Sequence, residues 1–216
     1  MRRIAMVLAG VIVVVLALVA PSIAASAAPV TLTTGCSAAY LSGDYRLGPA
    51  TTPDLGIVAL ELVGYHRFAG LSQQNFLADY WNSTTASWNY PPDNGYLIVA
   101  GHPVEFQQTL EPGQAIDRYG SLYGSFLAPF ATPYAARSIP PSSLDDSPGF
   151  TCNYHTYKVL KAFTVEAGPI APAFGQPGLG LQYQLVSSLL PGDPSTANVY
   201  WLVDNGYLAA TNGQAP

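Results

Sequence analysis

The chain has 216 residues, of which 13 are acidic and 8 are lysine or arginine, so that its formal net charge is −5. A chain of this length fits one domain and can bury a sizeable core. The excess of acidic residues argues against nucleic acid as a partner, because such binding depends on many cations that neutralise phosphates; a small phosphate-bearing molecule is not excluded.

The N-terminal segment predicts export. Arg2 and Arg3 precede an almost wholly apolar run from Ile4 to Ala20, and small residues follow at 25–28. This order is typical of a secretory signal peptide and its cleavage site. The alternative is a membrane anchor, because the run is close to the roughly 20 residues that span a bilayer. We predict a signal peptide over residues 1–28, a mature domain over 29–216, a secreted, extracellular location and no stable membrane insertion after cleavage.

Nineteen prolines and 20 glycines punctuate the chain, so most secondary-structure elements must be short. The apolar run Ile57–Val63 is compatible with a strand or a short helix. Ser72 is a good N-cap for a helix over Gln73–Trp81, in which apolar residues recur at helical spacing. Asp93–Gly95 and Pro112–Gly113 have the composition of turns.

Strands are predicted where β-branched and aromatic residues gather, at Tyr96–Val99 and Val159–Val165. Val199–Val203 is compatible with a strand or a helix and ends at the turn residues Asp204–Gly206. The sum predicts an α+β fold: a strand-rich single domain with a twisted antiparallel sheet, few short helices and long ordered loops.

The two cysteines, Cys36 and Cys152, predict a disulfide, because an even number of cysteines in an exported protein is usually paired. Closing a loop of this length stabilises the fold by roughly 4–5 kcal/mol at most. The alternative is a nucleophilic thiol, but neither cysteine lies in a recognisable catalytic signature.

Common catalytic signatures are absent from the sequence. It has no Gly-x-Ser-x-Gly elbow, no Walker loop, no His-x-x-x-His pair and no paired-cysteine metal spacing. The three histidines, His66, His102 and His155, are scattered, which favours structural or surface roles. The glycine-rich stretch Gly175–Gly180 contains a proline and follows no predicted strand, so we interpret it as a turn rather than a dinucleotide fingerprint.

Polar and aromatic residues cluster around the few cations. Isolated arginines among aromatic residues and glycines are suited to hold a pyrophosphate while rings stack on nicotinamide or adenine. The alternative is that Asp117 and Arg118 are a neighbouring pair without a special role and that the aromatic residues belong to the core. The clusters are Ile116–Gly120, Tyr123–Pro129, Ala136–Pro141, Tyr154–Tyr157 and Gly168–Tyr183.

These clusters resemble the domain of the tuberculosis necrotizing toxin family, which includes secreted NAD⁺ glycohydrolases of moulds and other microbes. Within this family they resemble the surface enzymes of moulds in particular. The similarity extends from Gly43–Pro49 to Gly206–Leu208, essentially the whole mature chain. It includes Trp88–Gly95, which resembles the family's Tyr-Pro-Pro-x-Asn-Gly block. The order of the blocks, rather than any single block, makes this resemblance specific.

The resemblance implies roles for four residues in catalysis. Arg118 matches the conserved arginine of the family's substrate site, and Arg137 matches the second arginine of the mould enzymes. Phe126 matches an aromatic residue of the same pocket. That residue is a tyrosine in the toxin branch, so any role of its hydroxyl cannot apply to this chain. Gln182 matches the glutamine required for activity; Gln176 is the nearby competitor.

Two further residues are implied in substrate binding. Tyr119 matches the ring directly after the conserved arginine, and His155 lies where the toxin branch places a histidine. The resemblance implies that the arginines hold phosphates while Phe126 and Tyr119 enclose the nicotinamide ribose. Gln182 then orients either the ribose or the attacking water.

The implied activity is hydrolysis of the nicotinamide–ribose bond of NAD⁺, and commonly in the family of NADP⁺, to nicotinamide and an ADP-ribose product, with no cofactor and no metal. Two alternatives remain: a secreted nucleotide-binding module without turnover, and transfer of ADP-ribose to a protein. Transfer calls for a glutamate near the ribose, whereas Glu61, Glu105 and Glu111 lie outside the matched blocks and Glu166 at the edge of one. A homodimer and an immunity protein stay open as partners.

Overall fold

The computed structural model describes residues 31–145 and 151–211. The segment interpreted as a signal peptide lies outside the described residues. The fold below belongs to the compact unit Leu32–Pro216. Within the described residues, no helix is long and apolar enough to cross a membrane.

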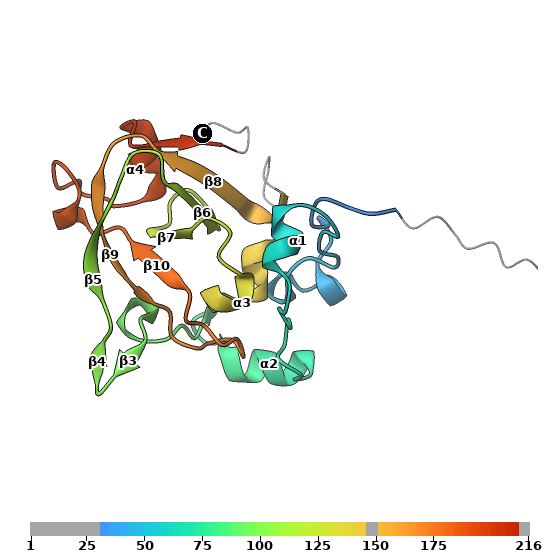
Figure 1. Cartoon of the computed structure of the whole chain (residues 1–216). Coiled ribbons are helices and arrows are strands. Elements are labelled where there is room, and N and C mark those ends of the chain that lie inside the picture. The colour runs from blue at the N-terminus through green and yellow to red at the C-terminus, as the bar shows by residue number, and fades with distance from the viewer. Residues whose placement is uncertain (1–30, 146–150, 212–216) are drawn as a thin grey trace, which may run out of the picture. The chain divides into compact units, whose positions relative to one another are not determined.

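A seven-stranded antiparallel sheet dominates the described residues, with neighbours in the order β11-β8-β6-β7-β10-β9-β5. Its strands are β5 (Phe106–Leu110), β6 (Ala115–Tyr119), β7 (Phe126–Pro129), β8 (Tyr154–Val159), β9 (Phe163–Pro169), β10 (Leu181–Gln184) and β11 (Leu208–Ala210). Two small hairpins are β1 (Trp81–Asn82) with β2 (Ser87–Trp88) and β3 (Ile98–Val99) with β4 (His102–Pro103). Figure 1 shows that the large sheet is strongly curled.

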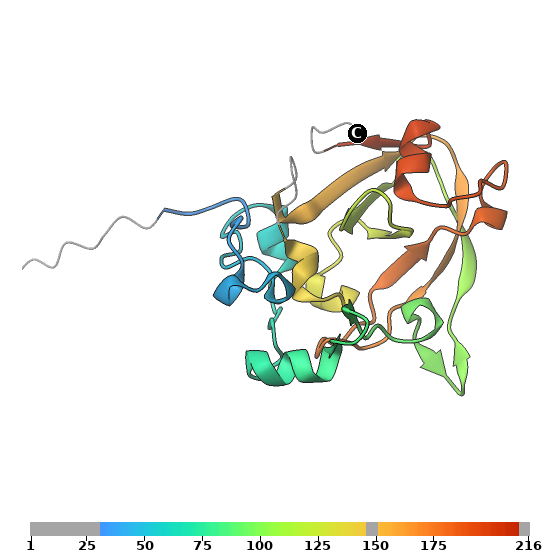
Figure 2. The same ribbon diagram turned by 180° about the vertical axis from the view of Figure 1, so that it is seen from behind.

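The helices are short and lie at two places around this sheet. They are α1 (Ile57–Glu61), α2 (Gln73–Tyr80), α3 (Tyr134–Arg137) and α4 (Val199–Asp204). Both views place α1, α2 and α3 on one side of the sheet and α4 near the other (Figures 1 and 2). Turns of 3-10 helix connect the elements: η1 (Leu41–Gly43), η2 (Tyr45–Leu47), η3 (Asp93–Gly95), η4 (Pro141–Leu144), η5 (Thr151–Asn153) and η6 (Ser187–Leu189). The predicted α+β class, the antiparallel sheet and the few short helices are confirmed.

Local signals located some of the elements. The Ser72 hydroxyl caps α2 by accepting a hydrogen bond from the Asn75 amide, as its side-chain chemistry predicts. The two ambiguous apolar runs both form helices, α1 and α4. The predicted turn at Asp93–Gly95 is η3, in which Asn94 and Gly95 have φ of 55° and 78°. Such values favour asparagine and glycine.

Two strand predictions need correction. The predicted strand Val159–Val165 is wrong, because β8 ends at Val159 and β9 begins at Phe163. The reversal between them lacks glycine and proline and is fixed from outside, by a hydrogen bond from the Leu160 amide to the Tyr207 carbonyl. Tyr96–Val99 is only partly a strand: β3 covers its last two residues, and Tyr96 forms an isolated bridge.

Two apolar clusters form the core. The larger lies on the sheet beneath α4 and includes Tyr157, Val165, Tyr183 and Leu202. The smaller joins α1 and α3 to the ends of β6 and β8, and its buried members are Val58, Tyr119, Tyr134, Leu144, Cys152 and Tyr154. This second cluster fixes the N-terminal segment against the strands that carry the candidate site.

The predicted disulfide between Cys36 and Cys152 is confirmed, and its two residues are 116 positions apart in the chain. It ties the N-terminal segment to η5, directly before β8. The Cys36 amide also donates to the Thr151 hydroxyl, at 3.0 Å. Because Cys152 is buried in the second cluster, the bond reinforces the contact between α1 and the two strands.

Candidate functional site

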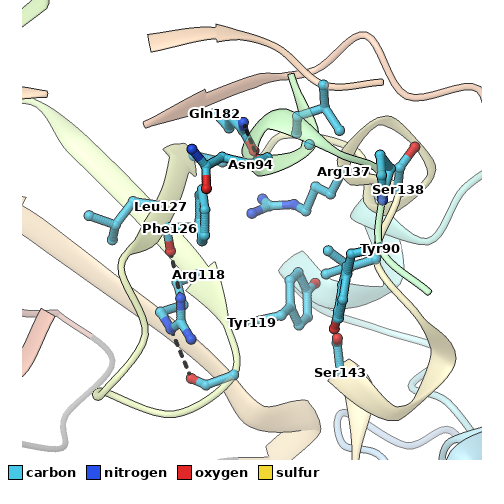
Figure 3. A pocket seen from close by; sticks show the side chains of 16 residues that line it. Tyr90, Asn94, Arg118, Tyr119, Phe126, Leu127, Arg137, Ser138, Ser143 and Gln182 are labelled. Carbon is cyan, nitrogen blue, oxygen red and sulfur yellow. Dashed lines mark hydrogen bonds between the residues drawn. The ribbon is translucent and has the colours of Figure 1, made fainter. Parts of the chain in front are cut away.

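A cavity of about 560 Å³ opens between the strands β6, β7 and β10, helix α3 and the segment around η3 (Figure 3). This volume lies within the range of small-molecule sites. Its lining residues are Tyr90, Pro91, Asn94, Gly95, Arg118, Tyr119, Gly120, Phe126, Leu127, Ala128, Arg137, Ser138, Ile139, Ser143, Ile170 and Gln182. The structure thus brings five of the predicted site residues to one cavity, and no carboxylate is among the described residues that line it.

Arg118 enters the cavity with its guanidinium held by backbone carbonyls. Nε donates to the Ser121 and Gly120 oxygens, at 2.7 and 3.2 Å, and Nη1 donates to the Phe126 oxygen at 2.7 Å. Burial lowers the pKa of Arg118, but arginine stays charged in proteins. Among the described residues, no carboxylate forms a salt bridge with this cation. A positive charge with fixed orientation and no counter-ion suits an anionic ligand.

Asp117 does not pair with Arg118, so the interpretation of the two as a neighbouring pair is wrong. Successive side chains of a strand point to opposite faces, and Asp117, which does not line the cavity, contacts other partners. Its Oδ1 lies 2.6 Å from Nη1 of Arg137, and its Oδ2 accepts the Ala131 amide at 2.9 Å.

A glycine makes room for the Arg118 guanidinium. A Cβ atom at Gly124 would overlap the guanidinium carbon and Nη2 of Arg118, and a Cβ at Gly120 would lie 3.0 Å from Nη2. Gly124 lies outside the region of positive φ that favours glycine, so its missing side chain matters here for space rather than for backbone conformation. Gly120 and Gly124 therefore leave the space that the guanidinium of Arg118 occupies.

Arg137, the last residue of α3, lies at the cavity with all three guanidinium nitrogens engaged. Nε donates to the Thr132 carbonyl at 2.9 Å, Nη1 pairs with Asp117 and Nη2 lies 3.2 Å from Glu61 Oε2. The guanidinium carbon lies 5.1 Å from the centre of the Tyr119 ring. Burial works against the charge of Arg137, but the two carboxylates outweigh it and raise the pKa. Its charge is therefore compensated from within the protein, unlike that of Arg118.

Behind the cavity, tyrosines and carboxylates form a buried network around Arg137. Glu61 is 2% exposed, accepts a hydrogen bond from the Tyr119 hydroxyl at 2.8 Å and lies 2.7 Å from the Tyr154 hydroxyl oxygen. The Tyr154 hydroxyl also lies 2.8 Å from Asp117 Oδ2. Burial raises the pKa of Glu61 to about 7; the charge of Arg137 opposes this shift and that of Asp117 adds to it.

Gln182 reaches the cavity from β10. Its Nε2 donates to the Asn94 carbonyl at 3.0 Å, which fixes the amide plane. The Gln182 side chain also forms a hydrogen bond with the Tyr96 hydroxyl, and the residue lines the cavity. Gln176 is placed differently: its Nε2 donates to the His66 carbonyl at 2.8 Å, and it does not line the cavity.

The glycine-rich stretch before β10 packs against α3. The Gly180 amide donates to the Ala136 carbonyl at 2.9 Å, and a Cβ at Gly180 would lie only 2.7 Å from that oxygen. This close approach fixes Gln182 and Arg137 relative to each other. The stretch is thus a structural turn, in agreement with its interpretation from the sequence.

The aromatic residues and His155 complete the picture. Phe126 and Tyr119 form parts of the cavity wall (Figure 3). His155 is paired in register with Arg118 across β6 and β8 but does not line the cavity. Burial, and then the charge of Arg118, lowers the pKa of His155 to about 4, so the ring is neutral at pH 7. Any role of this histidine is exerted through its neighbours.

Comparison with known proteins places the chain in a family. The sequence pattern described as tuberculosis necrotizing toxin matches residues 109–211. A curated relative, the conidial surface nicotinamide adenine dinucleotide glycohydrolase nadA of Aspergillus fumigatus, is 42% identical over 174 residues, which are 78% of this chain and 70% of the relative. The chain belongs to the tuberculosis necrotizing toxin family. The mould enzyme is thus similar over far more of the chain than the family pattern covers.

A solved structure of tuberculosis necrotizing toxin, complexed with its immunity factor, has the same fold. It aligns with a TM-score of 0.50 and 22% identity and covers 64% of this chain and 71% of that chain. The part matched by the family pattern contains Arg118, Arg137 and Gln182. Glu61 lies before it.

Sequence reasoning missed several residues of the site. Tyr90, Asn94, Ser138 and Ser143 line the cavity, and Glu61 stands behind it. Tyr90 and Asn94 lie in the block Trp88–Gly95, which was recognised as a similarity without a role. The only signal for Glu61 was an acidic residue inside an apolar run, which is unusual in a buried helix.

Proposed function

We propose that this protein is a secreted NAD⁺ glycohydrolase, which cleaves the nicotinamide–ribose bond of NAD⁺ to release nicotinamide and ADP-ribose and uses neither metal nor cofactor. The observation that carries the proposal is the convergence of Arg118, Phe126 and Gln182 on one cavity. The similarity to a mould NAD⁺ glycohydrolase supports it. NADP⁺ is a second substrate in this proposal.

The charge distribution suits this substrate. The Arg118 guanidinium has no carboxylate partner among the described residues, and its orientation is fixed by three carbonyl contacts. It therefore attracts the pyrophosphate of a dinucleotide without first breaking an ion pair. Arg137 is held by Asp117 and Glu61, and we assign it to shaping the cavity wall beside Tyr119 more than to phosphate binding.

The bond to nicotinamide needs little acid catalysis. Nicotinamide leaves from a cationic ring and requires no proton, and the ribose becomes oxocarbenium-like. Ordinary glycosidases flank such a bond with two carboxylates, whereas no described residue lining this cavity is acidic. We propose that the Gln182 amide oxygen accepts a hydrogen bond from the ribose or from the attacking water. Phe126 and Tyr119 exclude bulk water around the sugar.

The residues of the cavity support two other functions less well. In protein ADP-ribosylation, a glutamate would contact the ribose, but Glu61 is buried behind Tyr119 and no described glutamate lines the cavity. A binding module without turnover would use the same cavity, and the assay below separates the two.

The disulfide supports export, because such bonds persist in oxidising compartments. We propose that a signal peptide over residues 1–28 directs it, that the domain over 29–216 acts outside the cell, and that an immunity protein is its partner.

Purified exported protein is expected to release nicotinamide from NAD⁺, with the same rate in the presence of a strong chelator. Chromatographic measurement of free nicotinamide and ADP-ribose checks this. Turnover that is lost with chelator and restored by a divalent ion would contradict the metal-free mechanism. Binding of NAD⁺ without product would instead identify a binding module.

Gly124→Ala is expected to raise KM for NAD⁺ by about 10- to 100-fold, the range of one hydrogen bond to a charged group. The new methyl group displaces the Arg118 guanidinium and leaves the rest of the chemistry in place. Steady-state kinetics of Gly124→Ala, Arg118→Ala and the double variant give the decisive comparison. If Gly124 acts through Arg118, the double variant resembles Arg118→Ala. Independent, multiplying effects would show that Gly124 acts elsewhere; thermal melts must first show that each variant folds.

A further inference from the structure

The buried network behind the cavity holds one hydroxyl between two carboxyl groups. The oxygen of Tyr154 lies 2.7 Å from Oε1 of Glu61 and 2.8 Å from Oδ2 of Asp117. Both distances are those of hydrogen bonds between oxygens. Glu61 and Asp117 are 2% and 0% exposed, so water cannot relieve a mismatch between donors and acceptors here.

Counting protons shows what these two contacts require. A tyrosine hydroxyl carries one hydrogen and can donate one such bond, while an ionised carboxylate only accepts. With both carboxylates ionised, one of the two short O···O contacts would bring lone pairs together without a proton. A second proton on one carboxyl group removes this conflict, because that carboxyl donates to Tyr154 and Tyr154 donates to the other.

The remaining contacts indicate which carboxyl holds the proton. Asp117 accepts the Ala131 amide and lies 2.6 Å from Nη1 of Arg137, whereas Glu61 lies 3.2 Å from Nη2. The Asp117 carboxylate thus already has two donors, a backbone amide and the nearer guanidinium nitrogen. Glu61 can instead donate through Oε1 to Tyr154 while its Oε2 still accepts from Tyr119 and Arg137.

We propose that Glu61 is a positioning residue of the candidate active site and holds a proton that it shares with Asp117 through Tyr154. Arg137 then faces one negative charge, and the network is neutral as a whole. In this state it fixes Arg137 and Tyr119, both of which line the cavity. The positioning role rests on the proposed function, whereas the shared proton does not.

The N-terminal segment is therefore a functional part of the site. Glu61 ends α1, before the part of the chain that the family pattern matches. The disulfide and the smaller apolar cluster hold this segment against Tyr119 and Tyr154. This segment supplies the Glu61 carboxyl, which lies outside the residues 109–211 that the family pattern matches.

The network should respond to pH in one direction. The charged and titratable groups facing Glu61 are Arg137 from α3, Asp117 and Tyr119 from β6, and Tyr154 from β8. The pKa of Glu61 is raised from 4.5 to about 7 in the fold. The protonated Glu61 therefore contributes fully to the free energy of unfolding below about pH 4.5. This contribution is lost as the pH rises through about 7, because the unfolded chain releases the proton at a lower pH than the folded chain does.

Glu61→Gln and Glu61→Ala test the proposal, with Glu111→Gln as a matched control at an exposed turn. The glutamine amide reproduces the protonated carboxyl: its nitrogen donates to Tyr154 and its oxygen accepts from Tyr119 and Arg137. At pH 6, we expect Glu61→Gln to keep the parent's kcat and Glu61→Ala to lose roughly 10²-fold, as for a misplaced catalytic group. The parent's kcat should fall above about pH 7, whereas that of Glu61→Gln should stay level to pH 8.5 and Glu111→Gln should follow the parent.

Thermal melts from pH 5 to 8.5 give a second measurement that does not depend on activity. The melting temperature of the parent should fall relative to that of Glu61→Gln as the pH rises. Equal pH dependence in both, or a loss of kcat in Glu61→Gln as large as in Glu61→Ala, would overturn the shared proton. If the parent releases no nicotinamide at any pH, the proposed function fails and the positioning role fails with it. The melts still show whether Glu61 holds the shared proton.

Discussion

Gln182→Ala is expected to lower kcat for NAD⁺ hydrolysis by about 10²–10³-fold with little change in KM. The Gln182 amide is held by the Asn94 carbonyl and by the Tyr96 hydroxyl, and the residue lines the cavity. A preorganised acceptor of this kind acts mainly as the bond breaks, because positive charge then develops on the ribose. Steady-state kinetics with NAD⁺ measure both constants.

Gln176→Ala is the matched control. Both glutamines are largely buried, and each donates to a backbone carbonyl: Gln182 to Asn94, and Gln176 to His66 with a second, longer hydrogen bond to Phe174. The two variants should therefore lose similar stability, about 1 kcal/mol each, while only Gln182→Ala loses activity. Full activity in Gln182→Ala together with inactivity in Gln176→Ala would reverse the assignment of the two residues.

The fold was predictable where local chemistry decides it. The cap of α2 and the turns with asparagine and glycine follow from side-chain and backbone preferences that act over a few residues. The reversal at residues 160–162 was not predictable, because a distant segment fixes it through the Tyr207 carbonyl. Likewise, nothing in the run Ile57–Val63 decides between strand and helix. Its choice depends on packing against Tyr119 and Tyr154 in the smaller apolar cluster.

The site was predictable where it consists of contiguous blocks. Arg118, Phe126 and Gln182 were assigned by resemblance, and the structure brings them to one cavity. Glu61 was missed because its significance depends on three partners from β6, β8 and α3, 58 to 93 positions away in the chain. The pairing of Asp117 with Arg137 was missed for the same reason: strand alternation separates neighbours and brings distant residues together.

Arg137→Ala is expected to destabilise the fold by about 3–5 kcal/mol, the cost of leaving a buried charge without its partner. Arg137 is 5% exposed and compensates Asp117, which is not exposed at all. Its removal also leaves the Thr132 carbonyl without its donor. Urea unfolding at pH 6 measures the change, which should grow at higher pH, where Glu61 also releases its proton.

Arg46→Ala is the matched control, because it removes an arginine–aspartate pair that lies at the surface. Arg46 Nη2 and Asp44 Oδ2 are 2.6 Å apart, but the side chains are 28% and 25% exposed. Water and salt screen such a pair, so the expected loss is below about 1 kcal/mol and shrinks at high ionic strength. Adding Asp117→Asn to Arg137→Ala should restore part of the lost stability, because it removes the orphaned charge. If the double variant is no more stable than Arg137→Ala, the loss comes from the packing of Arg137 against Tyr119 rather than from its charge.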